Sequence, residues 1–363
     1  MMKSAKTLRH QVGLLFIVGL EGTGPSSLET AWLRTLQPSG IILFKRNIES
    51  PRQVHDLFHS VSAALRHPFF RCVDLEGGTV DRLRDLIGPT PSAATVAVTG
   101  RLAFYKKHGA LIGRMLETLG FQVNFAPVLD LATPACRAVM GTRVVAEDPA
   151  AVAQYARAFL AGLASHGVYG CGKHFPGLGS GNLDSHQAMP KIVRTWKQMQ
   201  LDISPYHALH ASLPFIMVNH SAYPEIEQPP KPASLSRFWI TDILRKQIKY
   251  RGLILSDDME MGGVLNYTSI EDAAIEAIAA GTDLIEICHR PDRILGAYEA
   301  VLHEAECSPT FARTVAAASA RVLRSRSRLL HRSQLPRPAS TAQIENLRTA
   351  LRKFTDALAE HIK

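Results

Sequence analysis

The chain has 363 residues, of which 46% are hydrophobic and 20% charged, with a formal net charge of +9. This composition is typical of an ordinary globular protein with one large core or two smaller ones. From residue 308 onward eleven Lys and Arg stand against three Asp and Glu, which leaves about +1 for the rest of the chain. We interpret this basic tail as a solvated helical face and expect no nucleic-acid partner.

The first predicted element is a buried strand at residues 12–20. Three basic residues precede this apolar run, as in a secretion signal, but no cleavage site of small residues follows it. We therefore expect a strand. No later apolar run is long enough to cross a bilayer, so we expect no membrane insertion.

Strands and helices are predicted to alternate along the rest of the chain. Seven further apolar runs predict strands at residues 40–44, 70–75, 122–128, 169–174, 214–218, 252–255 and 283–288. Amphipathic stretches between them include residues 103–119, 150–165, 195–211, 235–249 and 270–280, with helix start signals at Ser50-Pro51, Asp148-Pro149 and Ser269. Eight strand-helix repeats predict an α/β fold, a (β/α)8 TIM-type barrel, rather than an open sheet.

The end of the chain has a different composition. Residues 333–342 are rich in Ser, Pro and Thr, and residues 342–362 have helical periodicity. We expect a single catalytic barrel domain at residues 1–335, followed by a linker and a C-terminal helix at residues 336–363.

Polar residues close six of the predicted strands, and a barrel gathers its C-terminal strand ends around one pocket. They are Asp74 and Glu76, Asp130, Lys173 and His174, His220, Asp257 and Asp258, and His289. We expect Glu76 to accept backbone hydrogen bonds from the following glycine turn. Asp130 and His220 fit either a substrate contact or a supporting role.

Two segments carry the groups that chemistry would need. Lys173 and His174 begin a loop rich in glycine that continues to Asp184-Ser185-His186, and rigid turns bearing titratable groups are typical of catalytic loops. Side chains alternate along an extended segment, so one of Asp257 and Asp258 should face the pocket and the other cap the next turn. Asp257 could instead be a helix cap, with Asp258 the better candidate for that role.

Several short motifs follow one another along the chain: Gly40-Ile41-Ile42-Leu43-Phe44, Asp74-Leu75-Glu76-Gly77-Gly78 with Arg82, Asn124-Phe125-Ala126-Pro127, Gly141-Thr142-Arg143, Lys173-His174, Ile216-Met217-Val218-Asn219-His220, Pro232-Ala233-Ser234-Leu235-Ser236 and Ser256-Asp257-Asp258-Met259. Jointly they resemble glycoside hydrolase family 3, in its single-domain β-N-acetylhexosaminidase branch, over roughly residues 10–290.

The resemblance implies that Asp257 is a nucleophile and that His186, paired with Asp184, is the general acid/base. It implies sugar binding by Asp74, Arg82, Arg143, Lys173 and His174. The reaction would be retaining hydrolysis of a terminal β-linked N-acetylglucosamine, typically from peptidoglycan fragments in cell-wall recycling. The chain departs from the family's Gly-His-Gly-Asp-Thr loop at Leu178, Ser180 and Gly181. We expect this departure to affect the closed conformation of the loop and the rate of hydrolysis.

Three alternatives remain open from the sequence. A metal-dependent barrel hydrolase would need clustered ligands, often His-x-His on the first strand, and that strand has none. A sugar-binding barrel without turnover and a β-glucosidase are the others. We expect no metal and no nucleotide cofactor. Five cysteines without a C-x-x-C pair favour a reducing cytoplasm, and we expect a monomer.

Overall fold

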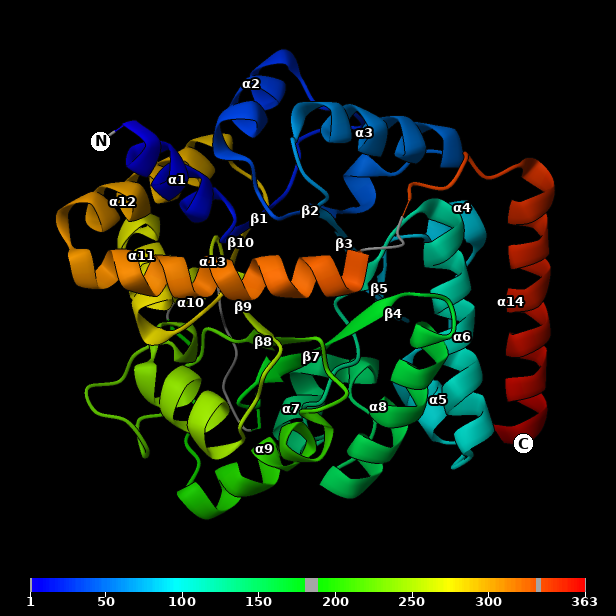
Figure 1. Cartoon of the computed structure of the whole chain (residues 1–363). Helices are drawn as coiled ribbons and strands as arrows, with labels where there is room; N and C mark the ends of the chain where they lie inside the picture. Colours follow the sequence, from blue (N-terminus) through cyan, green and yellow to red (C-terminus); the bar gives the residue numbers. More distant parts are fainter. Residues whose placement is uncertain (1, 180–188, 331–333, 363) are drawn as a thin grey trace.

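The computed structural model describes residues 2–179, 189–330 and 334–362. Its centre is a closed barrel of parallel strands, surrounded by helices (Figure 1). The hydrogen-bonded order around the barrel is β1-β10-β9-β8-β7-β6-β3-β2. The strand bounds are β1 Phe16–Val18, β2 Gly40–Leu43, β3 Phe70–Val73, β6 Val123–Asn124, β7 Tyr169–Phe175, β8 Phe215–Val218, β9 Leu253–Asp258 and β10 Leu284–Ile287. The predicted barrel is confirmed.

All eight predicted strands overlap an observed one, but the first prediction is too long. Val12 belongs to helix α1 (Met2–Gly13), and strand β1 begins only at Phe16. Leu8 and Val12 both pack on the core, and their spacing of four residues is that of a helix face rather than of a strand. A continuous apolar run hides this boundary, because the buried face of a helix and a buried strand look alike over a few residues.

Helices follow most barrel strands, and the three predicted start signals are confirmed. Ser50, Asp148 and Ser269 each accept backbone N–H groups as N-caps. The helices are α2 Ser27–Leu36, α3 Pro51–Ala64, α4 Arg84–Ile87, α5 Ala93–Ala97, α6 Leu102–Leu119, α7 Pro134–Met140, α8 Pro149–Ala164, α9 Trp196–Leu209, α10 Gly262–Leu265, α11 Ile270–Ala280, α12 Pro291–Cys307, α13 Pro309–Leu330 and α14 Thr341–Ile362.

The helix predicted at residues 235–249 is not an ordinary α-helix. A single 3-10 turn, η3 (Ala233–Leu235), comes first, and a π-helix, η4 (Phe238–Gln247), follows. Its last turn is closed by a five-residue hydrogen bond from the N–H of Ile248 to the carbonyl of Ile243. Two other 3-10 turns, η1 (Lys45–Asn47) and η2 (Gly141–Arg143), and a hairpin of β4 (Leu75–Gly77) and β5 (Val80–Asp81) lie beside the barrel mouth.

Helix α13 crosses the end of the barrel where the strands begin (Figure 1). Arg321 pairs at 2.5 Å with Asp283, just before β10, and the carbonyl of Leu329 accepts a hydrogen bond from Tyr169, the first residue of β7. Arg326 is also buried and contacts His67. The predicted solvated face is observed for Arg324 and Arg328, which are exposed, but not for Arg321 and Arg326, which contact residues at the base of the barrel.

The C-terminal helix α14 lies beside α6 and α4 (Figure 1). Its buried side chains join the main hydrophobic core through Leu347, Leu351 and Phe354. Four of the five cysteines are buried, and all five are free thiols. Within the described ranges, no helix is long and apolar enough to cross a membrane.

Candidate active site

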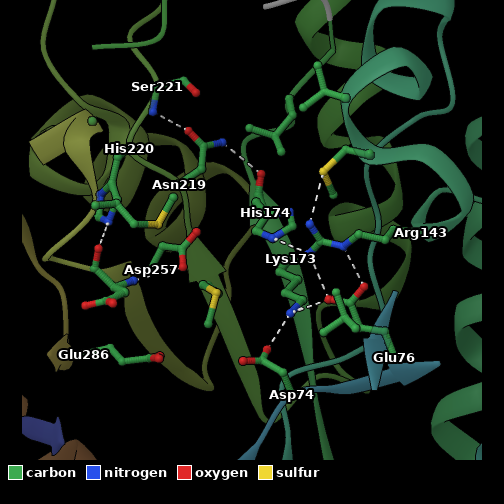
Figure 2. A pocket seen from close by; sticks show the side chains of 18 of the residues that line it. Asp74, Glu76, Arg143, Lys173, His174, Asn219, His220, Ser221, Asp257 and Glu286 are labelled. Carbon is green, nitrogen blue, oxygen red and sulfur yellow. Dashed lines mark hydrogen bonds and ion pairs between the residues drawn. The ribbon is translucent and has the colours of Figure 1, made fainter. Parts of the chain in front are cut away.

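A pocket of about 370 Å³ opens at the C-terminal ends of the barrel strands (Figure 2). This volume is within the range of small-molecule sites. The predicted residues that line it are Asp74, Glu76, Arg82, Arg143, Lys173, His174, His220, Asp257 and Asp258. The convergence expected from the strand ends is therefore observed for most of them.

Lys173, near the end of β7, is the buried cation of the pocket. Its Nζ lies 2.7 Å from Asp74 Oδ1 and 2.7 Å from Glu76 Oε1. Burial alone would lower the pKa of this ammonium, but the two carboxylates outweigh burial and raise it. Lys173 therefore stays charged and holds two strand ends together.

Glu76 was expected to accept backbone hydrogen bonds from the glycine turn, and this prediction is wrong, because its partners are cations. Arg143 donates two hydrogen bonds to Glu76, from Nε to Oε2 at 2.8 Å and from Nη2 to Oε1 at 2.9 Å. Burial opposes the charge of Glu76, yet Lys173 and Arg143 lower its pKa to about 2. The sequence could not reveal this pair because 67 residues separate Arg143 from Glu76.

Asp130 supports the pocket without lining it. Its Oδ2 accepts the backbone N–H of His174 at 3.2 Å and the ring Nδ1 at 2.7 Å, while Oδ1 accepts the N–H of Leu178 at 2.8 Å. The choice left open for Asp130 is thereby settled in favour of support. His174 itself lines the pocket, with Nε2 facing Arg143 at 3.3 Å.

Arg82 reaches the pocket from the segment after β5. Its Nη2 lies 3.9 Å from Asp74 Oδ2, and its guanidinium stacks 5.5 Å from the ring centroid of Phe44. Phe44 follows β2 and also lines the pocket. Arg82 and Phe44 therefore form one wall, with Asp74 between Arg82 and Lys173.

The alternation prediction for the two aspartates at the end of β9 is only partly confirmed, because Asp258 caps the next turn as expected but both residues line the pocket. Asp257 Oδ1 accepts the N–H of Asp258 at 2.9 Å. Asp258 Oδ1 caps the next turn by accepting the N–H of Glu260 at 3.0 Å. Among the described residues no donor contacts Oδ2 of Asp257, which is half-buried, so one oxygen is available to a substrate.

His220 has a supporting role. Its Nε2 contacts the carbonyl oxygen of Asp258 at 3.0 Å, so that nitrogen carries the proton, and its Nδ1 accepts from Ser234 Oγ at 2.7 Å. Burial lowers the pKa of His220, although Asp257 acts in the opposite direction. A neutral imidazole with both nitrogens occupied positions the backbone after β9 and is not free to transfer protons.

His289 was also predicted at the pocket, but it does not line it. His289 is exposed beside it, 3.4 Å from Asp258 Oδ2 and stacked near Phe44. Asp184 and His186 lie outside the described residues. Sequence reasoning missed Asn219, which donates to the carbonyl of His174 at 3.0 Å, and Glu286. A charge inside the apolar run 283–288 was the available signal for Glu286.

Over the part of the chain that the structure describes, no three His, Cys, Asp or Glu side chains gather in a way that could hold a metal ion. Two carboxylates of the pocket, Asp74 and Glu76, are instead paired with Lys173, Arg143 and Arg82. Such an array suits a small polar ligand with several hydroxyl groups, because alternating donors and acceptors can each bind one. Fold and site together define an enzyme of the (β/α)8-barrel class.

Comparison with known proteins identifies the family. The model of the glycosyl hydrolase family 3 N-terminal domain matches residues 7–325. A beta-hexosaminidase of Idiomarina loihiensis is 34% identical over 278 residues, which cover 75% of this chain and 83% of that protein. The chain belongs to glycosyl hydrolase family 3, in its β-N-acetylhexosaminidase branch, which confirms the resemblance and the prediction of a glycosidase.

Two solved structures agree with this assignment. A family 3 β-N-acetylglucosaminidase from Paenibacillus superposes with a TM-score of 0.89 at 26% identity, covering 96% of this chain and 68% of that chain. NagZ from Neisseria gonorrhoeae, solved in complex with N-trifluoroacetyl-D-glucosamine, has a TM-score of 0.72 at 27% identity, covering 85% of this chain and 97% of that chain.

Proposed function

We propose that the protein removes terminal β-linked N-acetylglucosamine with retention of configuration, through a covalent glycosyl intermediate on Asp257. The relatives named beta-hexosaminidase and β-N-acetylglucosaminidase support the substrate class. The observation that carries the proposal is the carboxylate of Asp257, which lies at a barrel strand end on the pocket wall with one oxygen uncontacted by described residues. A retaining glycosidase needs such a carboxylate to attack the anomeric carbon.

The sugar is bound with its anomeric carbon at Asp257 and its hydroxyl groups against the charged residues of the pocket. These lining residues include the cations Lys173, Arg143 and Arg82, the carboxylate Asp74, and His174. Charged partners make strong hydrogen bonds to neutral hydroxyl groups. We assign these five residues to the subsite for the non-reducing sugar.

His186, oriented by Asp184, is the proposed general acid/base. An unperturbed histidine has a pKa of about 6.5, so it can both protonate the leaving oxygen and later deprotonate water. Both residues lie outside the described residues, yet the described chain on either side of them supports the assignment, because Leu178 and Pro190 both line the pocket. Leu178 is held by Asp130, and the carbonyl of Pro190 accepts the N–H of Ala222 at 2.8 Å.

The biological setting follows from the same family. We propose peptidoglycan fragments as substrates in cell-wall recycling, carried out by a monomer in the cytoplasm. The free state of all five cysteines supports a reducing compartment. The described C-terminal helix α14 and the barrel share one core, and we propose residues 1–335 as the catalytic domain with 336–363 as an appended linker and helix.

A sugar-binding barrel with little or no turnover is the second candidate. The specific observation in its favour is Leu178, a departure from the family's loop sequence that is buried and packs on a hydrophobic cluster. An apolar side chain there cannot supply the polar contacts of the usual histidine.

Release of p-nitrophenol from its β-N-acetylglucosaminide separates the candidates. We expect turnover of this substrate, at least a hundredfold higher kcat/KM than for the matching β-glucoside, and a β-configured product in NMR spectra taken immediately after mixing. Binding of N-acetylglucosamine without turnover would support the sugar-binding barrel. Preference for the glucoside would support a β-glucosidase.

A further inference from the structure

Glu286 is a carboxyl group on the floor of the pocket that the proposed mechanism does not use. It lies near the end of β10, is 3% exposed and lines the pocket. Its main chain is fixed, because its N–H donates to Ser256 Oγ at 3.1 Å and its carbonyl accepts the N–H of Met259 at 2.9 Å. Figure 2 shows the side chain below Asp257, with its carboxyl end directed toward Asp74.

The partners of Glu286 differ from those of the other carboxyl groups around the pocket. Asp74 and Glu76 each pair with Lys173, and Asp257 and Asp258 each accept a backbone N–H. Glu286 Oε1 contacts only the thiol of Cys288, at 3.1 Å, and Oε2 has no hydrogen-bond partner among the described residues. A buried oxygen without a partner is costly, and one on the wall of a pocket can be satisfied by a bound ligand.

The surroundings favour the protonated form of this carboxyl group. Burial raises the pKa of Glu286, and the charges of Asp74, Asp258 and Asp257 raise it further. Burial and the neighbouring Glu286 also raise the pKa of Cys288, which stays a thiol and can donate to Oε1. A neutral carboxyl group offers one O–H donor as well as acceptor oxygens.

We propose that Glu286 is a specificity-determining residue whose carboxyl group hydrogen-bonds a hydroxyl group of the sugar. The inference rests on the proposed function for the position of the sugar, whose anomeric carbon lies at Asp257. Because Glu286 lies below Asp257 with its carboxyl end directed toward Asp74 (Figure 2), the hydroxyl is one carried by the part of the ring near these two aspartates. A protonated acid suits a hydroxyl group of the ligand better than it suits an ammonium group of the ligand, because an ammonium binds best to a charged carboxylate.

Sugar binding measured without turnover tests this role. Ligand-observed NMR titrations would give the Kd of N-acetylglucosamine and of its 3-, 4- and 6-deoxy forms for the wild type, Glu286→Gln and Glu286→Met. Glutamine keeps a donor and an acceptor, so its Kd should stay within about threefold, whereas methionine should raise the Kd about tenfold. One deoxy sugar should bind the wild type and Glu286→Met equally, which identifies the hydroxyl.

The controls separate binding from folding. Glu286→Met should unfold at the same temperature as the wild type or a higher one, because it removes a buried carboxyl group without a cation. Glu227→Gln is the matched control, since Glu227 Oε2 also lacks a partner among the described residues but lies outside the pocket. It should leave every Kd unchanged.

Three results would overturn the inference. The first is an unchanged Kd for N-acetylglucosamine in Glu286→Met. The second is an equal loss of affinity for all three deoxy sugars in the wild type and in Glu286→Met. The third is binding of glucosamine that depends on the charge of Glu286 and disappears in Glu286→Gln. Normal sugar binding by a wild type that does not hydrolyse the glycoside would contradict the proposed function and leave this role of Glu286 supported. A wild type that binds no N-acetylglucosamine would contradict both.

Discussion

Asp130 holds His174 at two points, accepting both its backbone N–H and its ring Nδ1 on the same oxygen, Oδ2. The other ring nitrogen faces Nη2 of Arg143 at 3.3 Å, and a guanidinium can only donate. The imidazole therefore carries its proton on Nδ1 and presents Nε2 as an acceptor. Asp130 sets both the position and the tautomer of a group that lines the pocket.

Asp130→Asn should impair catalysis although the side chain never touches the pocket. The amide has only one acceptor oxygen, so it cannot receive N–H groups from His174 and Leu178 together. We expect kcat/KM for p-nitrophenyl β-N-acetylglucosaminide to fall about tenfold to a hundredfold, as is typical when a residue that orients a substrate-contacting side chain is replaced. A changed pH profile, in a variant that still unfolds cooperatively well above the assay temperature, would mark this positioning effect. Wild-type kinetics at all pH values would contradict it.

Glu76→Gln should destabilise the fold as well as the site. It removes the carboxylate that pairs with both Arg143 and Lys173 and leaves two buried cations with fewer partners. We expect the free energy of unfolding in urea to fall by about 3 kcal/mol at pH 7. Because Lys173 and Arg143 lower the pKa of Glu76 to about 2, this stabilisation is present above pH 4.5 and is lost as pH falls toward 2.

The Glu76 prediction has an internal check. In Arg143→Met, the two hydrogen bonds from Arg143 to Glu76 are already lost. Adding Glu76→Gln should therefore lower the free energy of unfolding by less than it does in the wild type. Equal costs in the two backgrounds would mean that Arg143 and Glu76 do not interact, against the geometry.

His108 should make stability fall in acid. It is fully buried in α6, and burial lowers its pKa to about 3. Between pH 6.5 and 3 the unfolded chain binds a proton there that the native protein does not, so the free energy of unfolding falls by about 1.4 kcal/mol per pH unit as pH decreases.

His108→Gln, which keeps a polar partner for Tyr155 but does not titrate, tests this effect. Urea unfolding at several pH values from 4 to 7 should give a shallower decline in the free energy of unfolding than for the wild type. Parallel declines would show that His108 is protonated in the native protein.

Much of the fold could be predicted from sequence because each barrel strand is a short apolar run between amphipathic helices. The errors lie where a pattern is ambiguous over few residues, as at Val12, whose apolar neighbours suit both a strand and a helix. Arg326 was misjudged because a cation-rich helix face normally meets solvent, and only tertiary structure shows that it is buried at the base of the barrel.

The site was predictable where chemistry sits at strand ends, as for Lys173 and Asp257, both of which line the pocket. Partnerships across the barrel were not predictable, because the pairing of Glu76 with Arg143 depends on side-chain direction rather than on spacing. Glu286 illustrates the same limit. Its charge was visible in the sequence, but its unpartnered oxygen and its place on the pocket floor required the structure.

The central claim, that Asp257 is the nucleophile, is tested most directly by trapping the covalent intermediate. A 5-fluoro N-acetylglucosaminyl fluoride slows hydrolysis of the intermediate, and proteolysis with mass spectrometry then locates the sugar. We predict a single glycosyl adduct on Asp257, absent from Asp257→Ala. An adduct on any other residue, including the adjacent Asp258, or turnover of the probe by Asp257→Ala, would contradict the account.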